Sequence, residues 1–169
     1  MPIEVSAFAV LRLGDAEAVA GLIRAAFAVL EEAVDPLPSA LGETAGSVAA
    51  GLADGGGCGV WVAGELVGAV LWQPRGGGLY VGRLSVHPDR RGQGIARRLM
   101  AAAEQAARDA GLPRLLLSTR LALVGNRALF AACGFVEMSV HAHPGHAVPT
   151  FVSLEKTLVE MRADVDDVI

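Results

Sequence analysis

The sequence has few cysteines, few aromatic residues and no long uninterrupted apolar run. Its 169 residues include two cysteines, and aromatic side chains make up 5% of the chain. Cys58 and Cys133 stand far apart, without the close spacing that metal sites and disulfide frameworks show. Apolar residues form 53% of the chain, but glycine, proline and charge divide them into runs shorter than the ~20 residues that cross a bilayer. We therefore expect two buried, unpaired cysteines and no membrane span.

Basic residues are also in the minority. Lys and Arg number 14 against 18 Asp and Glu, which gives a formal net charge of −4. This balance offers no general attraction to nucleic acid or anionic lipid. The first residues, from Met1 to Ser6, lack a basic region followed by an apolar stretch and a cleavage site. The sequence predicts a cytoplasmic protein that binds neither nucleic acid nor membrane.

Hydrophobic periodicity predicts a mixed α/β sheet with helices on both faces, in a single domain over residues 1–169 with a frayed tail at 160–169. Period-two patterns and short apolar runs predict strands at 8–13, 59–63, 65–73, 79–86, 114–119, 135–142 and 150–157. Spacings of three and four predict helices at about 16–30, 39–53, 95–110 and 126–132. We expect Asp15 to cap the first helix, Gly55 to Gly57 to form a loop, and residues 74–78 to form a turn.

A glycine turn stands between the buried strand at 79–86 and the helix that follows it. Gly92 and Gly94 occupy the place where unpaired backbone amides point outward at the positive end of a helix dipole. Glycine also lets the backbone approach a diphosphate closely. Four arginines gather at this helix start: Arg90, Arg91, Arg97 and Arg98. The pattern indicates a phosphate site, and the alternative is an ordinary turn with a solvated basic face.

Two well-known phosphate loops do not match this turn. The dinucleotide fingerprint requires a third glycine where the sequence has Arg97. The nucleoside triphosphate loop requires Gly-Lys followed by Ser or Thr, and the only lysine is Lys156. Neither class of nucleotide-binding protein is therefore predicted.

Residues 84–99, LSVHPDRRGQGIARRL, resemble the main motif of the GNAT family of N-acetyltransferases. The family signature is Gln or Arg, two residues, Gly, one residue, then Gly or Ala, and Arg91, Gly94 and Ala96 fill it. Residues 126–135 are similar to the family's short helix that closes in Gly-Phe. The resemblance implies a mostly antiparallel sheet of six to seven strands. It also implies direct transfer of an acetyl group from acetyl-CoA, without a metal, to an amine of a small molecule or peptide.

The resemblance also assigns the residues that bind acetyl-CoA. The strand before the turn splays from its neighbour in this family, which leaves the main chain of Leu84 and Val86 free to pair with the pantetheine arm. Asn126 either bonds the pantetheine or caps its own helix. The backbone amides of the turn would surround the diphosphate, and Arg91 or Arg97 would add a charge-assisted bond. The turn residues concerned are Arg91, Gly92, Gln93, Gly94 and Ala96.

At the catalytic positions the sequence departs from the family. Phe130 stands where many members have a tyrosine that protonates the departing thiolate. His87, at the end of the central strand, and Tyr80, earlier on it, are the candidate catalytic residues, although His87 also fits a solvated strand terminus. Arg83 would favour an acceptor with a carboxylate or phosphate if it faces the cleft. Phe130 also motivates an alternative, a CoA-binding module without turnover.

Three histidines and the last strands carry two further hypotheses. His141, His143 and His146 suit a metal by type and spacing, but Pro144-Gly145 between them predicts a hairpin turn, and we expect the turn. The last two strands could support a homodimer.

Overall fold

Seven strands and four α-helices form the part of the chain that the computed structural model describes, residues 7–30 and 33–158. The strands are β1 (Ala7–Val10), β2 (Gly56–Val62), β3 (Glu65–Arg75), β4 (Gly78–Val86), β5 (Arg114–Arg120), β6 (Val136–His141) and β7 (Phe151–Thr157). The helices are α1 (Ala16–Ala28), α2 (Ala45–Asp54), α3 (Ile95–Asp109) and α4 (Val124–Ala132). The expected frayed tail at 160–169 and the segment from Met1 to Ser6 lie outside the described residues. No helix within the described ranges has the length and apolar character that a bilayer span requires.

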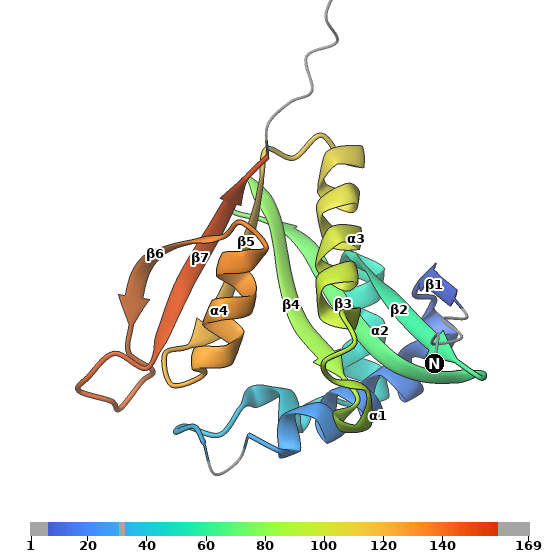
Figure 1. Cartoon of the computed structure of the whole chain (residues 1–169), viewed down its shortest axis with the longest axis horizontal. Helices are drawn as coiled ribbons and strands as arrows, with labels where there is room; N and C mark the ends of the chain where they lie inside the picture. The colour runs from blue at the N-terminus through green and yellow to red at the C-terminus, as the bar shows by residue number, and fades with distance from the viewer. Residues whose placement is uncertain (1–6, 31–32, 159–169) are drawn as a thin grey trace, which may run out of the picture.

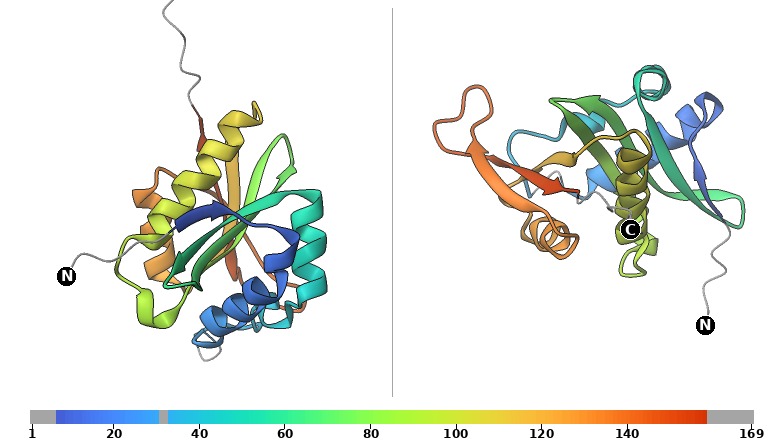
Figure 2. Two further views of the ribbon diagram at one scale, coloured as in Figure 1. Left: turned by 90° about the vertical axis from the view of Figure 1, so that its right-hand side faces the viewer. Right: turned by 90° about the horizontal axis from the view of Figure 1, so that it is seen from above.

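The strands form one sheet in the order β1-β2-β3-β4-β5-β7-β6. Every neighbouring pair is antiparallel except β4 and β5, which run parallel. One apolar core joins α1 and α2 to the sheet, and a second joins α3 and α4 to it (Figures 1 and 2). The predicted mixed sheet with helices on both faces is confirmed.

The start of α1 differs from the prediction. The apolar stripe of this helix is buried as expected, with Val19 and Ile23 fully enclosed. Asp15 stands at the position before the helix, but its side chain caps no helix amide. Its Oδ2 accepts a hydrogen bond from the Arg12 amide at 2.8 Å, within the short 3₁₀ turn Leu13–Asp15. The expected cap is wrong because that turn takes up the carboxylate.

The helix expected at 39–53 is divided. A 3₁₀ turn, Ser39–Gly42, precedes α2, which begins only after Thr44. The Thr44 hydroxyl accepts from the Ser47 amide at 3.1 Å, and the Ser47 hydroxyl accepts from the Thr44 amide at 2.9 Å. This reciprocal capping fixes a new helix start and leaves Glu43 in an extended link.

The expected loop at Gly55 to Gly57 is wrong, because β2 begins at Gly56. Glycine is required there by close packing. A Cβ built on Gly55 would lie 2.0 Å from the Trp72 carbonyl oxygen, and one on Gly57 would lie 2.6 Å from the Val70 carbonyl oxygen. The three glycines thus let the chain approach β3 closely.

The β3–β4 hairpin is longer than expected. β3 continues to Arg75, so Pro74 belongs to the strand and is paired with Leu79. The turn is reduced to Gly76 and Gly77, both with a left-handed backbone at φ 60° and 77°.

A bulge interrupts β4 near its middle. Val70 of β3 faces two residues of β4, Arg83 and Leu84. Arg83 has a left-handed backbone, with φ at 54°, and the Ser85 hydroxyl donates to its carbonyl at 3.0 Å. The bulge alters the direction of the side chains on this part of β4.

β4 and β5 are paired only at one end. Leu79 is paired with Leu115 and Tyr80 with Leu116, and no pair follows. Beyond Tyr80 the two strands diverge (Figure 1), which leaves main-chain groups of β4 without a partner on β5. We call the open region between the two strands the fork.

Candidate functional site

The glycine turn, residues 91–96, has the geometry of an anion site. Gly92 and Gly94 have left-handed backbones, with φ at 75° and 78°, which L side chains rarely adopt. Arg98 is the first residue of α3 whose amide bonds back along the helix, to the Gly94 carbonyl at 3.2 Å. The amides before it at the start of α3 therefore have no intrahelical acceptor and point outward at the positive end of the helix dipole.

The four arginines of this region differ in their surroundings. The Arg98 guanidinium lies over the Phe8 ring, 3.9 Å from its centroid, and Arg91 Nη2 donates to the Ala26 carbonyl at 3.1 Å. Arg90 and Arg97 line a cavity beside the turn. Of the two expected cation donors, Arg97 is thus less engaged with protein groups than Arg91.

That cavity, which we call the turn cavity, has a volume of about 450 Å³ and is lined by residues of α1, β4, α3 and α4. The predicted cofactor residues Leu84, Val86, Arg91, Gly92, Gly94, Ala96, Arg97 and Asn126 all line it. Gln93 is exposed and is not among the lining residues. The structure therefore brings together the predicted strand, turn and helix residues around one space.

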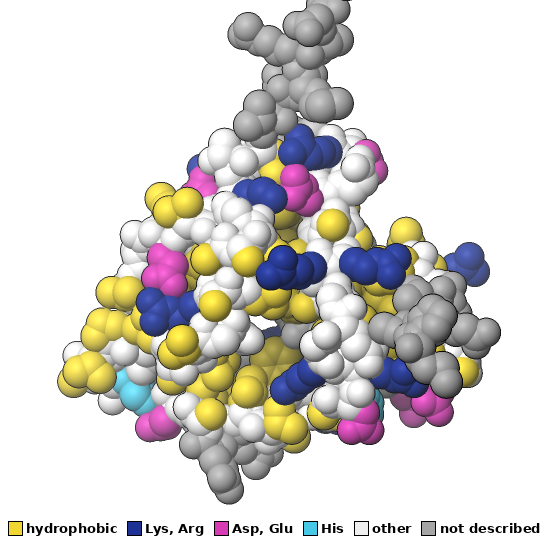
Figure 3. Space-filling model, viewed as in Figure 1, with side chains coloured by type: hydrophobic (Ala, Val, Ile, Leu, Met, Phe, Trp, Pro, Cys, Tyr) yellow, Lys and Arg dark blue, Asp and Glu magenta, His cyan; other side chains and the backbone are white. Residues whose placement is uncertain are grey.

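A larger cavity, which we call the fork cavity, occupies about 640 Å³ between β4 and β5. Its charged and titratable lining residues are Glu43, Arg75, Tyr80, Arg83, Arg120 and His143, and its aromatic lining includes Phe27, Trp72, Phe130 and Phe151. Figure 3 shows the hollow at the centre of the face, with apolar side chains inside it and Lys or Arg side chains around it. The two cavities share Phe27, Leu30, Leu84 and Asn126, so they meet at the fork.

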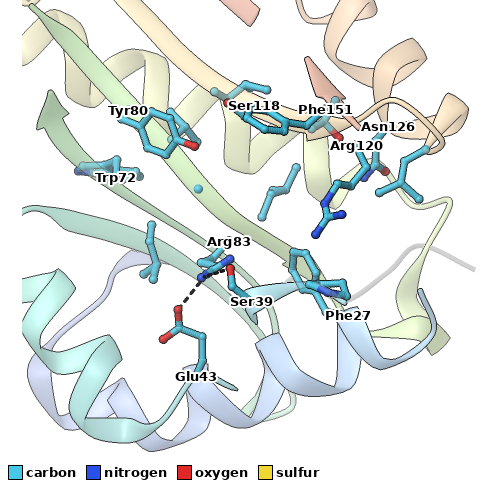
Figure 4. A pocket seen from close by; sticks show the side chains of 18 of the residues that line it. Phe27, Ser39, Glu43, Trp72, Tyr80, Arg83, Ser118, Arg120, Asn126 and Phe151 are labelled. Carbon is cyan, nitrogen blue, oxygen red and sulfur yellow. Dashed lines mark hydrogen bonds and ion pairs between the residues drawn. The ribbon is translucent and has the colours of Figure 1, made fainter. Parts of the chain in front are cut away.

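Arg83 faces the fork cavity but is already paired. Its Nε donates to Glu43 Oε1 at 2.9 Å and its Nη2 to the Ser39 hydroxyl at 3.1 Å (Figure 4). The Glu43 carboxylate also accepts a hydrogen bond of 2.5 Å from the Ser47 hydroxyl. The ion pair between Arg83 and Glu43 thus connects the bulge on β4 to the segment between α1 and α2, and the two charges neutralise each other.

The two candidate catalytic residues lie in different places. Tyr80 lines the fork cavity, and its ring lies under the Arg75 guanidinium at 4.4 Å. His87 lines neither cavity. Its Nδ1 accepts from the Asp89 amide at 3.2 Å, at the start of the short turn Pro88–Arg90. The structure thus places Tyr80 at the cavity and leaves His87 with a local capping contact.

Asn126 lies within α4 and not at its cap. Leu123 occupies the cap position and makes no side-chain cap bond, so the alternative that Asn126 caps its helix is wrong. Asn126 instead lines both cavities where they meet. Phe130, one turn further along α4, is buried and packs edge-on against Phe135, with 6.0 Å between the ring centroids.

The three histidines near β7 do not gather into a metal site. His143 and Thr150 are hydrogen-bonded, and His146 lies 3.4 Å from the Asp35 carboxylate. Burial, Arg120 and His146 lower the pKa of His143. The His146 amide bonds to the His143 carbonyl at 3.0 Å, which is the expected turn. Within the described ranges, no group of three or more His, Cys, Asp or Glu side chains could hold a metal ion.

Sequence patterns did not single out several residues of the fork cavity. Phe27 and Glu43 fell within predicted helices and Trp72 within a predicted strand, and no motif distinguished them from their neighbours. Arg120 directly follows the strand predicted at 114–119, where the alternation of faces could have marked it. Glu43 carried no comparable local signal, because its role depends on contact with β4, 40 positions away in sequence.

Solved structures with the same fold include two acetyltransferases. The ribosomal-protein-S18-alanine N-acetyltransferase of Escherichia coli is 15% identical with a TM-score of 0.72, over 94% of this chain and 97% of that one. The PaiA N-acetyltransferase of Thermoplasma acidophilum, in complex with CoA, is 14% identical with a TM-score of 0.74, over 90% and 99%. At these identities the likeness concerns the fold. A comparison with curated protein sequences finds no match.

The sequence itself shows the family. The model of the Acetyltransferase (GNAT) family matches residues 26–135, which include α2, α3, α4 and the glycine turn. The chain belongs to the GNAT family of acetyltransferases.

Proposed function

We propose that this protein transfers an acetyl group from acetyl-CoA directly to an amine of a small molecule or peptide. The observation that carries the proposal is the meeting of the two cavities at the fork. One cavity ends at a helix start suited to a diphosphate, and the other is open to a second substrate. A thioester at the residues common to both would be accessible to an amine in the fork cavity.

The turn cavity supports binding of the cofactor in an extended form. The backbone amides of the glycine turn would donate hydrogen bonds to the diphosphate oxygens, and Arg97, which lines the cavity, would add a cation. Leu84 and Val86 lie on the part of β4 that has no partner on β5. Their main chain would pair with the amide groups of the pantetheine, as an added strand pairs with a sheet edge.

The chain's contribution to chemistry is mainly orientation. In the reaction the amine nitrogen forms a bond to the thioester carbon, the carbon–sulfur bond breaks, and the proton lost from nitrogen ends on the thiol. Phe130 cannot donate that proton, so the proton would reach the sulfur from the amine, directly or through water. Holding the two reactants at the fork lowers the entropic part of the barrier.

The proposed roles of the two candidate catalytic residues differ. Tyr80 is four positions from Leu84 along β4, a separation on the order of 10 Å, so we assign its hydroxyl to acceptor binding at the far end of the fork cavity. His87 as a general base stays a prediction. A homodimer also stays a prediction; it would use the edge strand β6, where Val136, Met138 and Val140 are exposed.

Two measurements on the purified chain test the proposal. Calorimetric titration would give acetyl-CoA affinity, and a thiol reagent would follow CoA release with a panel of amines. We expect binding together with amine-dependent release. Binding without release on any amine would favour the non-catalytic CoA module, and absence of binding at saturating concentration would contradict both functions.

A further inference from the structure

The charges around the fork cavity are unequally compensated. Glu43 is the only carboxylate among the described residues that line it, and its oxygens are engaged by Arg83 and Ser47. Arg75 lies over an aromatic ring at the outer edge. Burial and the charges of Arg120 and His146 lower the pKa of His143, which disfavours a positive charge on that ring. The remaining cation in the lining is Arg120.

Arg120 has few partners for its donors. It ends β5, and its guanidinium points into the cavity toward Phe27 (Figure 4). Its Nη2 donates one long hydrogen bond, to the Leu37 carbonyl at 3.4 Å. Its Nη1 is buried and has no hydrogen-bond partner in the described part of the chain. A buried donor without an acceptor costs free energy that a suitable ligand recovers.

The charge of Asp35 acts on this cation but does not neutralise it fully. Burial lowers the pKa of Arg120, and the charge of Asp35 opposes that effect. The Asp35 side chain is 90% exposed, however, and lies 3.4 Å from His146. Solvent screens such an exposed charge strongly, so an anion inside the cavity would interact with Arg120 more favourably.

We propose that Arg120 binds a carboxylate of the acceptor, and that the acceptor is an amino carboxylate with an apolar or aromatic group. This inference rests on the proposed function. Arg120 and Asn126 lie on the same side of the cavity (Figure 4), and Asn126 lines the junction with the turn cavity. A carboxylate on the guanidinium would therefore hold a nearby amine at the fork, with the side group toward Trp72 and Tyr80.

The inference separates classes of amine. The planar guanidinium of an arginine can donate two parallel hydrogen bonds to a carboxylate. A polyamine or aminoglycoside is positively charged, so Arg120 would repel it. A peptide amino terminus presents an amide in place of the nearby carboxylate. Free amino acids with apolar side chains are thus predicted to be better acceptors than polycations or peptides.

Matched ligands test the carboxylate directly. Turnover would be compared for phenylalanine and phenylalaninamide, which share the amine and the ring. Binding to the CoA-loaded protein would be compared for their N-acetyl derivatives. For the unmodified protein, kcat/KM should be at least about tenfold higher for the acid than for the amide, and Kd at least about tenfold lower. A factor of this size is what a hydrogen bond to a charged group contributes.

Variants assign the preference to one residue. Arg120→Gln should reduce the preference for the acid over the amide to within about twofold. Arg120→Lys should retain part of this preference, because the positive charge persists while the pair of parallel hydrogen bonds is lost. Arg12→Gln removes the same charge from an exposed side chain that lines neither cavity, and should retain the full preference. Thermal melting and acetyl-CoA affinity would establish that each variant is folded.

Equal use of acid and amide, or a preference that persists in Arg120→Gln, would overturn the inference. If no amine is acetylated, the proposed function fails. The binding comparison then still decides whether Arg120 holds a carboxylate.

Discussion

Arg83 on the β4 bulge and Glu43 before α2 form an ion pair of 2.9 Å that joins the sheet to the segment between α1 and α2. The pair is partly shielded, with 31% of the Arg83 side chain and 15% of the Glu43 side chain exposed. It lies in the lining of the fork cavity. The pair therefore links stability to the shape of the acceptor site.

Glu43→Gln is expected to weaken this link. The substitution leaves Arg83 with a neutral acceptor, and should lower the free energy of unfolding by about 1 kcal/mol, near the upper end for exposed pairs. It should also reduce kcat/KM for amines while acetyl-CoA affinity stays close to that of the unmodified protein. Urea denaturation and steady-state kinetics measure both effects. Glu65→Gln, an exposed residue outside both cavities, is the matched control and should change neither.

Gly94→Ala and Gly111→Ala form a matched pair at opposite ends of α3. Both glycines have a left-handed backbone, with φ at 78° and 68°, and a Cβ on either would meet no atom within 4 Å. Each substitution should destabilise the fold by about 1 kcal/mol through backbone strain. Only Gly94→Ala should weaken acetyl-CoA binding, because only that residue belongs to the glycine turn. Equal loss of affinity in both variants would argue against a diphosphate site there.

Asn126→Ala separates a ligand-binding role from a structural one. Loss of a helix cap costs about 1 kcal/mol, but Asn126 caps nothing, so the unfolding free energy should change by less than about 0.5 kcal/mol. Acetyl-CoA affinity should fall, since Asn126 lines both cavities. A stable variant with unchanged affinity and turnover would remove Asn126 from the site.

Lys156→Met should change stability in a way that depends on pH. Burial tends to raise the pKa of Glu104, but hydrogen bonds and charges of Lys156 and Arg108 outweigh it, so the pKa is lowered from 4.5. A lowered carboxyl pKa stabilises the fold above the unfolded value, and this stability is lost as the pH falls through the folded value. The variant should therefore be less stable by about 1 kcal/mol at pH 7.

The difference between the two proteins should begin to shrink as the pH falls toward 4.5, the ordinary value in the unfolded chain, and should disappear once the pH lies below the lowered pKa of Glu104 in the folded protein. Denaturation curves from pH 3 to pH 8 measure it. A constant difference across that range would show that packing of the lysine stem, and not its charge, is responsible.

The sequence predicted those parts of the fold that depend on local pattern. The sequence predicted β4, the glycine turn and α3, because three local patterns follow one another directly. These are an apolar run, two closely spaced glycines and an apolar stripe of helical period. The residues proposed to bind the cofactor lie on these elements, apart from Asn126 on α4, and all but Gln93 line one cavity. The family resemblance added the divergence of the strands that forms the fork.

Features that depend on contacts between distant segments were not predictable in this way. The sequence predicted a loop at Gly55 to Gly57, because no pattern in the neighbouring residues reveals that these glycines pack closely against β3. The pairing of Arg83 with Glu43 and the buried Nη1 of Arg120, which has no hydrogen-bond partner in the described residues, depend on side-chain directions that periodicity does not give. Asp15 shows the opposite case: a local cap signal was present, but the predicted cap is wrong because the carboxylate bonds to the Arg12 amide in the preceding turn.

A crystal structure of the chain with acetyl-CoA tests the central claim most directly. The account predicts diphosphate oxygens within about 3.2 Å of backbone nitrogens in the glycine turn, with the thioester at the fork beside Leu84 and Asn126. A diphosphate bound away from residues 91–96 would contradict it.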